Sequence, residues 1–207
     1  MRSRFEAPHT TAIPTGVNLE YFSPPVSSPP AADLIFVGSM DWLANIDGVR
    51  YLVKEILPLI RRSRPNCSLA IVGRNPTPEI QALARQDPRI QVTGTVADIR
   101  PYLWGSLISI VPLRIGGGTR LKIYESMAAK VPVVSTSVGA EGLECRPELE
   151  IRIADTAEAF AEACLGLLEN APARAQMAEA AWQLVSSRFS WEQVARCFEG
   201  ALEMAPR

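Results

Sequence analysis

The segment 107–136 constrains the fold more than any other part of the sequence. The apolar run 107–113 predicts a buried strand, and the three glycines at 116–118 follow it. From Thr119 apolar residues recur at helical spacing, and 131–136 again predict a buried strand. Strand, glycine loop, helix and strand form a βαβ unit, in which the two strands run parallel.

The rest of the chain continues the same alternation. The further expected strands cover 34–37, 68–72, 90–94 and 149–153, and the further expected helices cover 45–60, 79–86, 98–104, 156–168, 172–187 and 190–202. Alternating strands and helices of this length predict an α/β fold with a doubly wound, parallel, Rossmann-like sheet.

Polar residues at the expected helix starts predict capping hydrogen bonds. We expect Asn45, Asp98 and Ser190 to act as N-caps, and Asp155 to open a capping box. Pro58 lies inside an expected helix, which it should kink or shorten because proline lacks the backbone N–H.

Three aromatic residues could either pack in the core or contact a ligand or another domain. Trp42 could stack on a sugar or a base, but we expect it to pack in the core. Trp191 and Phe198 in the last helix are expected to make core or interdomain contacts.

The first 32 residues differ from the rest in composition. Residues 1–32 hold many prolines and are expected to form a Pro-rich leader or interdomain linker, whereas 33–207 form the folded domain. Within the leader, the segment 13–22 (IPTGVNLEYF) predicts an edge strand and a turn.

Composition limits the class of protein. The chain has 207 residues, 47% of them hydrophobic and 21% charged, with a net charge of -1, so general affinity for nucleic acid is not expected. No apolar run approaches the ~20 residues of a membrane-spanning helix, and 1–10 do not resemble a signal peptide. Cys67 and Cys164 are expected core thiols, and the single histidine, His9, excludes a His-rich metal site. We therefore expect a cytoplasmic protein without a metal.

The glycine loop carries the first functional hypothesis. In a parallel sheet the loops after the strands meet at one edge, and a helix N-terminus there favours an anion. Arg120 and Lys122 follow the glycines although basic residues oppose the helix dipole at this end. A phosphate or diphosphate over the loop would explain them. The alternative is that the glycines serve only a tight turn and that both basic side chains point into water.

Several motifs together resemble one family. FVGSM, LAIVGR, VTGTV, VPLRIGGGTRLKIYESMA, VPVVSTSVGAEGL and a final FSW resemble the carboxyl half of a glycosyltransferase of family 4, in the subgroup of sugar transferases linked to bacterial polysaccharide assembly. The resemblance runs from Ile13 to the end of the chain. It implies the GT-B architecture, in which two Rossmann-like domains face each other across a cleft. The carboxyl domain binds the nucleotide-sugar donor, and the amino domain, expected before 13–22, mainly binds the acceptor.

The resemblance also implies roles for individual residues. The family's paired-glutamate motif places its second carboxylate on Glu125, which would bind the ribose, whereas its first falls on Gly117 and is absent. Ser39 stands where the family often has a basic residue, and Asn45 stands near its usual lysine. The implied donor-binding residues are Gly38, Ser39, Arg74, Val96, Gly116, Gly117, Gly118, Thr119, Glu125 and Glu141, and the implied catalytic residues are Arg120 and Lys122.

The resemblance predicts a retaining, metal-independent hexosyltransferase that uses a nucleoside-diphosphate sugar and no other cofactor. Its partners would be an acceptor glycan or lipid-linked glycan and the amino-terminal domain, without which this chain alone is expected to be inactive. Peripheral contact with the inner face of a membrane stays open. Two alternatives also stay open: a stand-alone nucleotide-binding or regulatory module, and a nucleotide-sugar epimerase of the same fold.

Overall fold

The computed structural model describes residues 11–203, so His9 and the polar segment 1–10 lie outside the described residues. The strands are β1 (Ala32–Val37), β2 (Leu69–Val72), β3 (Ile90–Val92), β4 (Ser106–Val111), β5 (Val133–Ser135) and β6 (Arg152–Ile153). The helices are α2 (Leu19–Phe22), α3 (Leu43–Tyr51), the π-helix η1 (Leu52–Ile56), α4 (Leu57–Ser63), α5 (Pro78–Gln86), α6 (Arg100–Trp104), α7 (Leu121–Ala128), α8 (Ala157–Glu169), α9 (Ala171–Arg188) and α10 (Trp191–Glu203).

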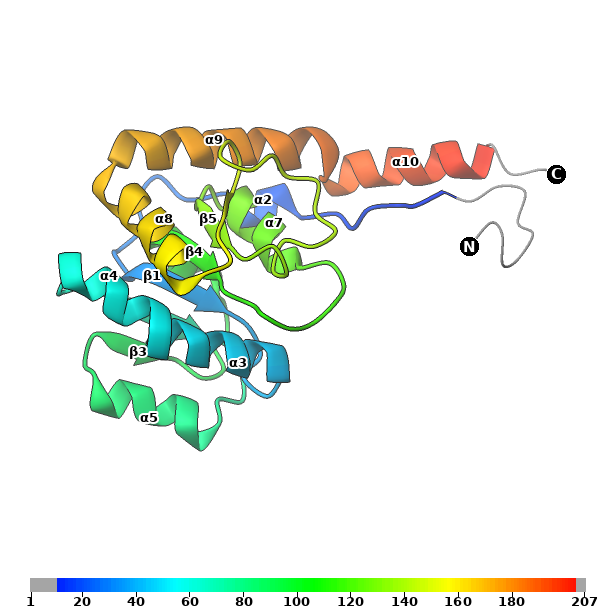
Figure 1. The fold of residues 1–207 in the computed structure, drawn as a ribbon. Helices are drawn as coiled ribbons and strands as arrows, with labels where there is room; N and C mark the ends of the chain where they lie inside the picture. Colours follow the sequence, from blue (N-terminus) through cyan, green and yellow to red (C-terminus); the bar gives the residue numbers. More distant parts are fainter. Residues whose placement is uncertain (1–10, 204–207) are drawn as a thin grey trace.

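The six strands form one parallel sheet in the order β3-β2-β1-β4-β5-β6. The chain therefore builds outward from β1 to β3, then returns to place β4 on the other side of β1. Right-handed crossovers in these two directions put α3–α4 and α7 on opposite faces. In Figure 1 the helices α3, α4 and α8 lie on one side of the sheet, and α7 and α9 lie on the other. The doubly wound α/β prediction is confirmed.

The two central strands explain why the sequence forms this sheet. Leu34, Ile35 and Phe36 of β1 are fully buried, as are Ile108 and Ile110 of β4. A strand covered by helices on both faces needs such a continuous apolar run. The cores of the expected strands are therefore confirmed, although β6 is shorter than expected.

The segment 13–22 differs from its prediction. It forms no edge strand: Val17 makes a single bridge to Ser190, and the next residues form the short helix α2. Asn18 caps this helix by accepting a hydrogen bond from the Tyr21 N–H at 2.9 Å. Phe22 then buries its ring in the core. Local capping and one buried aromatic residue thus outweigh the strand preference of the segment.

The shortening predicted at Pro58 is wrong, because the helical segment continues through η1 and α4 to Ser63; the kink stays a prediction. The π-helix η1 precedes it, with the Leu57 N–H donating to the Leu52 carbonyl, and Pro58 occupies the first turn of α4. The wider turn lies where a proline ring would clash with the preceding carbonyls. The apolar face consequently continues to Ile60.

The expected caps have mixed outcomes. Ser190 accepts a hydrogen bond from the Gln193 N–H at 3.3 Å and caps α10 as predicted. The N-cap position predicted for Asp98 is wrong by one residue: Ile99 is the N-cap of α6, and Asp98 accepts a hydrogen bond from the Arg100 N–H at 2.9 Å from one position earlier. The capping role of Asp155 is wrong, because Thr156 caps α8 and Asp155 instead binds Ser137.

Asn45 is not an N-cap either. The helix α3 begins at Leu43, after the N-cap residue Trp42, and Asn45 is buried within its first turn. The Asn45 side chain instead contacts Lys122 at the start of α7. The sequence pattern along α3 could not indicate a partner on another helix.

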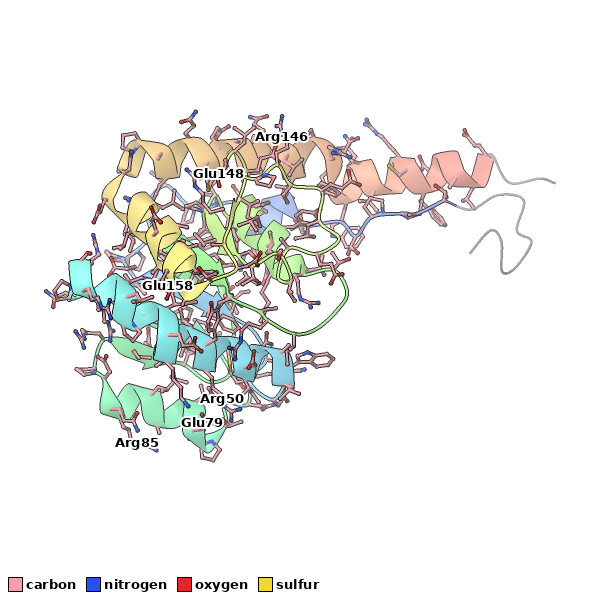
Figure 2. The ribbon with its side chains drawn as sticks, viewed as in Figure 1. Arg50, Glu79, Arg85, Arg146, Glu148 and Glu158 are labelled. Carbon is pink, nitrogen blue, oxygen red and sulfur yellow. The ribbon has the colours of Figure 1, made fainter. Side chains whose placement is uncertain are left out.

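Outside the sheet, ion pairs connect neighbouring helices. Figure 2 labels Arg50 and Glu79, where the Arg50 Nε donates to Oε1 at 2.9 Å and joins α3 to α5. Cys67 and Cys164 are buried, as expected of core thiols. Within 11–203 no helix is both long and apolar enough to cross a membrane.

Candidate functional site

An open pocket of about 310 Å³ lies where β1 and β4 end. These two neighbouring strands are the point at which the strand order reverses, which is the usual ligand site of a doubly wound sheet. The pocket is lined by Gly38, Ser39, Trp42, Ala44, Asn45, Leu113, Thr119, Arg120, Leu121 and Lys122. It therefore joins the loop after β1, the start of α3 and the start of α7.

The structure brings Lys122 and Asn45 together against Gly38. Lys122 Nζ donates to Asn45 Oδ1 at 2.9 Å, while Asn45 Nδ2 donates to the Ser39 carbonyl at 2.8 Å. A Cβ on Gly38 would lie 2.7 Å from Asn45 Nδ2 and 2.9 Å from Lys122 Nζ. Glycine at this position therefore lets both polar groups reach the backbone at the end of β1.

Lys122 is a half-buried cation on the wall of the pocket. Its ammonium lies 4.7 Å from the centroid of the Phe36 ring, and no carboxylate in the described chain forms a salt bridge with it. Burial, together with the positive charge of Arg120, lowers the pKa of Lys122 from 10.5 to about 8, which Glu125 only partly opposes. A half-buried cation without an acidic partner favours an anionic ligand.

Arg120 organises the glycine loop. Its side chain returns toward the loop, where Nη1 donates to the Gly118 carbonyl at 2.7 Å and also to the Gly117 carbonyl. Gly116 and Gly118 have φ values of 119° and 85°, which favour glycine. In the described chain Arg120 forms no salt bridge, so its charge, like that of Lys122, is not neutralised by an acid.

A polar cluster follows the ends of β1 and β2. Ser39 Oγ donates to Asp41 Oδ1 at 2.6 Å and accepts from Arg74 Nε at 2.9 Å. Asn75 Nδ2 donates to Asp41 Oδ2 at 2.8 Å. The hydrogen bonds from Ser39 and Asn75 lower the pKa of Asp41. Asp41 was not among the predicted site residues, although its position two residues after Ser39 places it in a loop at the carboxyl edge of the sheet.

A close backbone contact fixes this edge. A Cβ on Gly73, whose φ is 154°, would lie 1.8 Å from the Gly38 carbonyl oxygen. Met40 N–H also donates to the Arg74 carbonyl at 2.8 Å. The loops after β1 and β2 are consequently held in contact. Arg74 does not line the pocket itself, but it donates a hydrogen bond to Ser39, which does.

Glu125 lies further along α7 than Lys122. Its side chain is half-buried, and within 11–203 its carboxylate accepts no hydrogen bond. Burial raises the pKa of Glu125, against the opposing effect of Lys122. The carboxylate is therefore available to a ligand that donates hydrogen bonds.

The remaining predicted site residues occupy different places. Thr119 is exposed on the pocket wall, Val96 is partly buried after β3, and Glu141 is exposed after β5. Of the twelve predicted residues, the pocket wall contains Gly38, Ser39, Thr119, Arg120 and Lys122. Arg74, Val96, Gly116, Gly117, Gly118, Glu125 and Glu141 do not line it.

The core role expected for Trp42 is wrong. Its side chain is 67% exposed and lines the pocket. The helix α3 begins directly after Trp42, which directs this residue away from the sheet at the start of the helix. Trp191 and Phe198 are also more than half exposed on α10, which excludes the core alternative for both, whereas their expected interdomain contacts stay a prediction.

Among residues 11–203, no group of three or more His, Cys, Asp or Glu side chains is placed to hold a metal ion.

A curated protein from a cps region is similar to this chain. The chain is 24% identical over 169 residues to an uncharacterized 44.6 kDa protein in the cps region of Klebsiella pneumoniae. The match covers 78% of this chain and 44% of that protein, so the chain spans less than half of the length of its relative.

Solved structures share the fold. The C-terminal domain of the glycosyl transferase group 1 family protein LpcC from Francisella tularensis has a TM-score of 0.70 and 18% identity, covering 85% of this chain and 100% of that one. TarM from S. aureus, in complex with fondaparinux, α-GlcNAc-glycerol and UDP, has a TM-score of 0.78 and 15% identity, covering 96% and 40%. HepE from Anabaena, in complex with UDP and glucose, has a TM-score of 0.73 and 14% identity, covering 93% and 56%.

The family model described as glycosyl transferases group 1 matches residues 31–170, a span that contains all six strands and the whole pocket. Together with the parallel sheet of the GT-B carboxyl domains, this match shows that the chain belongs to the glycosyl transferases group 1 family.

Proposed function

We propose that this chain is the donor-binding part of a glycosyltransferase that transfers a sugar from a nucleoside-diphosphate sugar to an acceptor. The observation that carries the proposal is the half-buried ammonium of Lys122, which has an amide oxygen and an aromatic face as neighbours and no acidic partner in the described chain. A cation in this setting costs stability unless an anion binds next to it. The family to which the chain belongs supports the same reading.

The diphosphate would bind between the glycine loop and the start of α7. Lys122 would donate charge-assisted hydrogen bonds to its oxygens, and Arg120 would add a second positive charge from the N-cap position. Thr119 and the backbone N–H groups of Leu121 and Lys122 at the start of α7 would complete the anion site. Gly38, which brings Lys122 against the end of β1, sets the position of that ammonium.

The same groups would promote the reaction. When the bond between the sugar and the diphosphate breaks, negative charge develops on the departing diphosphate. Arg120 and Lys122 stabilise that charge because they are already positioned before the reaction begins. We propose that this stabilisation makes the transfer metal-independent and that the sugar keeps its anomeric configuration, so the reaction is of the retaining type.

Other residues would bind the nucleoside. Glu125 would accept hydrogen bonds from the ribose hydroxyls, because its half-buried carboxylate has no hydrogen-bond donor in the described chain. The backbone near Val96 would contact the base. Arg74 would act through Ser39, to which it is bonded, and Glu141 would contribute from the loop after β5.

The acceptor would bind elsewhere in the complete enzyme. We propose that an amino-terminal domain forms the other wall of the cleft and holds an acceptor glycan or lipid-linked glycan. We propose a cytoplasmic reaction, with access to the inner membrane face. The structural neighbours TarM and HepE are complexes with UDP, which supports a nucleotide donor here. Orientation of the acceptor supplies much of the rate, so this chain alone should show negligible transfer.

The test is a thermal-shift and calorimetric panel with UDP, GDP, ADP and their sugar conjugates, each in a chelator and again with magnesium. We expect one nucleotide series to bind in the chelator and to stabilise the fold by about 2.7 kcal/mol at a hundred times its Kd. Absence of binding by every series would contradict the proposed function. Binding only with magnesium would contradict metal independence and leave donor binding in place.

A further inference from the structure

Trp42 has no visible role in stabilising the fold. It is the N-cap residue of α3, where Ser, Thr, Asp or Asn would stabilise the helix, and its side chain makes no capping hydrogen bond. The same side chain is 67% exposed, so it does not contribute to the core. A residue that breaks two local preferences at the wall of a pocket suggests a ligand contact.

The glycine loop lies next to the start of α3. A Cβ on Gly117 would meet nothing in the described chain within 4 Å, and Gly117 is not among the positive-φ glycines. Its neighbour Gly116 lies against the start of α3, since a Cβ there would be 3.4 Å from Ala44 Cβ. Neither backbone conformation nor packing in the described chain requires glycine at 117.

The helix α7 orders the parts of the ligand. Arg120 and Lys122 fix the diphosphate at the start of the helix, and Glu125 lies nearly one turn further along for the ribose. Trp42 lines the pocket with Thr119, on the side of the helix start. The group attached to the far phosphate would therefore point toward Trp42.

We propose that Trp42 binds the transferred sugar by stacking its indole against the apolar face of the pyranose ring. This inference rests on the proposed function and names the residue that holds the sugar where Gly117 supplies no carboxylate. An indole face offers a large, rigid apolar surface at low conformational cost. Trp42 is thus a specificity-determining residue for the sugar and makes no contact with the nucleoside.

The experiment compares ligands with and without the sugar. Calorimetry measures the Kd values of UDP, GDP and ADP, and of UDP-glucose, GDP-mannose and ADP-glucose, for the wild type and for Trp42→Ala and Trp42→Phe. The matched control is Leu43→Ala, which removes a neighbouring side chain of similar exposure, 66%, that does not line the pocket. The unfolding midpoint of each variant checks that it folds.

The expected result is selective for the sugar. Trp42→Ala should weaken the nucleotide sugar about three- to tenfold and leave the free nucleoside diphosphate within about twofold. Trp42→Phe should recover most of the loss, and Leu43→Ala should change neither affinity.

Three results would overturn the inference, and they are distinguishable. Equal weakening of nucleotide and nucleotide sugar would place Trp42 on the nucleoside, while no weakening of either would remove it from the site. In both cases nucleotide binding by the wild type leaves the proposed function standing. If the wild type binds no nucleotide at all, the proposed function itself fails and the inference fails with it.

Discussion

Lys122 Nζ donates a 2.9 Å hydrogen bond to Asn45 Oδ1, and this contact joins the first turn of α7 to the first turn of α3 across 77 positions of sequence. Asn45 holds the ammonium by an uncharged oxygen and gives its own N–H to the Ser39 carbonyl. An aspartate at 45 would neutralise the cation, whereas asparagine positions it and leaves its charge for a ligand. The pair therefore fixes a positive charge at the switch point of the sheet.

Removal of that charge should separate stability from binding. Lys122→Met keeps an unbranched apolar chain and deletes a half-buried cation that has no acidic partner in the described chain. We expect a gain of about 1 kcal/mol in the free energy of unfolding, because such charges are retained for function at a cost in stability. Nucleotide affinity should fall at least about tenfold, since a charge-assisted hydrogen bond is lost.

Chemical denaturation and calorimetry measure the two quantities. Lys54→Met, at an exposed lysine of η1, is the control and should change neither by a significant amount. A Lys122→Met protein that is less stable than the wild type would show that this lysine serves the fold. Unchanged nucleotide affinity would remove Lys122 from the nucleotide site.

The pKa of Lys122 predicts how binding depends on pH. Burial lowers this pKa to about 8, so the empty protein loses the proton as the pH rises through 8. An anion binds the protonated form, so the affinity for the nucleotide sugar that the protein prefers should fall between about pH 7 and pH 9. The fold responds in the opposite sense: the unfolded chain keeps this proton up to its ordinary pKa of 10.5, so the Lys122 contribution to stability rises between pH 8 and 10.5.

Calorimetry at several pH values tests this dependence. Lys122→Arg is the matched variant, because a guanidinium stays charged throughout this range. The variant should bind with a nearly constant affinity, even if that affinity is lower than in the wild type. A fall of the same size in both proteins would assign the pH dependence to another group.

The glycines of the site predict a graded series of stability losses. Gly73→Ala places a Cβ 1.8 Å from the Gly38 carbonyl oxygen and should destabilise the fold by about 3 kcal/mol or more. Gly94→Ala has a φ of 69° but open space and should cost about 1 kcal/mol. Gly117→Ala has neither problem and should be close to neutral.

Denaturant unfolding of the three alanine variants measures the series. The order of the losses is the decisive result. Gly94→Ala lacks the steric clash of Gly73→Ala, and Gly117→Ala also lacks the positive φ. A Gly117→Ala loss as large as that of Gly73→Ala would mean that the glycine at 117 is needed by the fold, which would also weaken the argument for an open sugar site.

The sequence was sufficient for the sheet because β1 and β4 are continuous apolar runs whose burial on both faces leaves little choice of structure. It was also sufficient to place Arg120 and Lys122 at a helix start. It did not reveal what Asn45 contacts, since the partner lies on α7 and a local pattern shows only the capping preference of asparagine.

Trp42 shows a second limit of reasoning from sequence. Large aromatic residues are usually buried, and that average predicted a core position. The direction of its side chain depends on the start of α3 relative to the sheet, a tertiary relation to which no local pattern refers. The Asp41 cluster was missed for the same reason, because Arg74 and Asn75 reach Asp41 and Ser39 only when the loops after β1 and β2 lie in contact.

The ribose assignment of Glu125 predicts that its effect disappears when a ribose hydroxyl is removed. The wild type should bind the preferred nucleoside diphosphate more tightly than its 2′- or 3′-deoxy form, because a hydrogen bond to a charged group contributes about 1.5–3 kcal/mol. Glu125→Ala should bind both forms equally, and Glu125→Gln, which keeps the shape but not the charge, should lie between them. Calorimetric affinities for the three proteins then give a coupling free energy between Glu125 and the hydroxyl of about 1 kcal/mol.

Glu158→Ala on α8, which is outside the pocket, controls for the loss of a carboxylate. Equal discrimination by all proteins would remove Glu125 from the ribose, and with it the direction along α7 in which the nucleotide is placed.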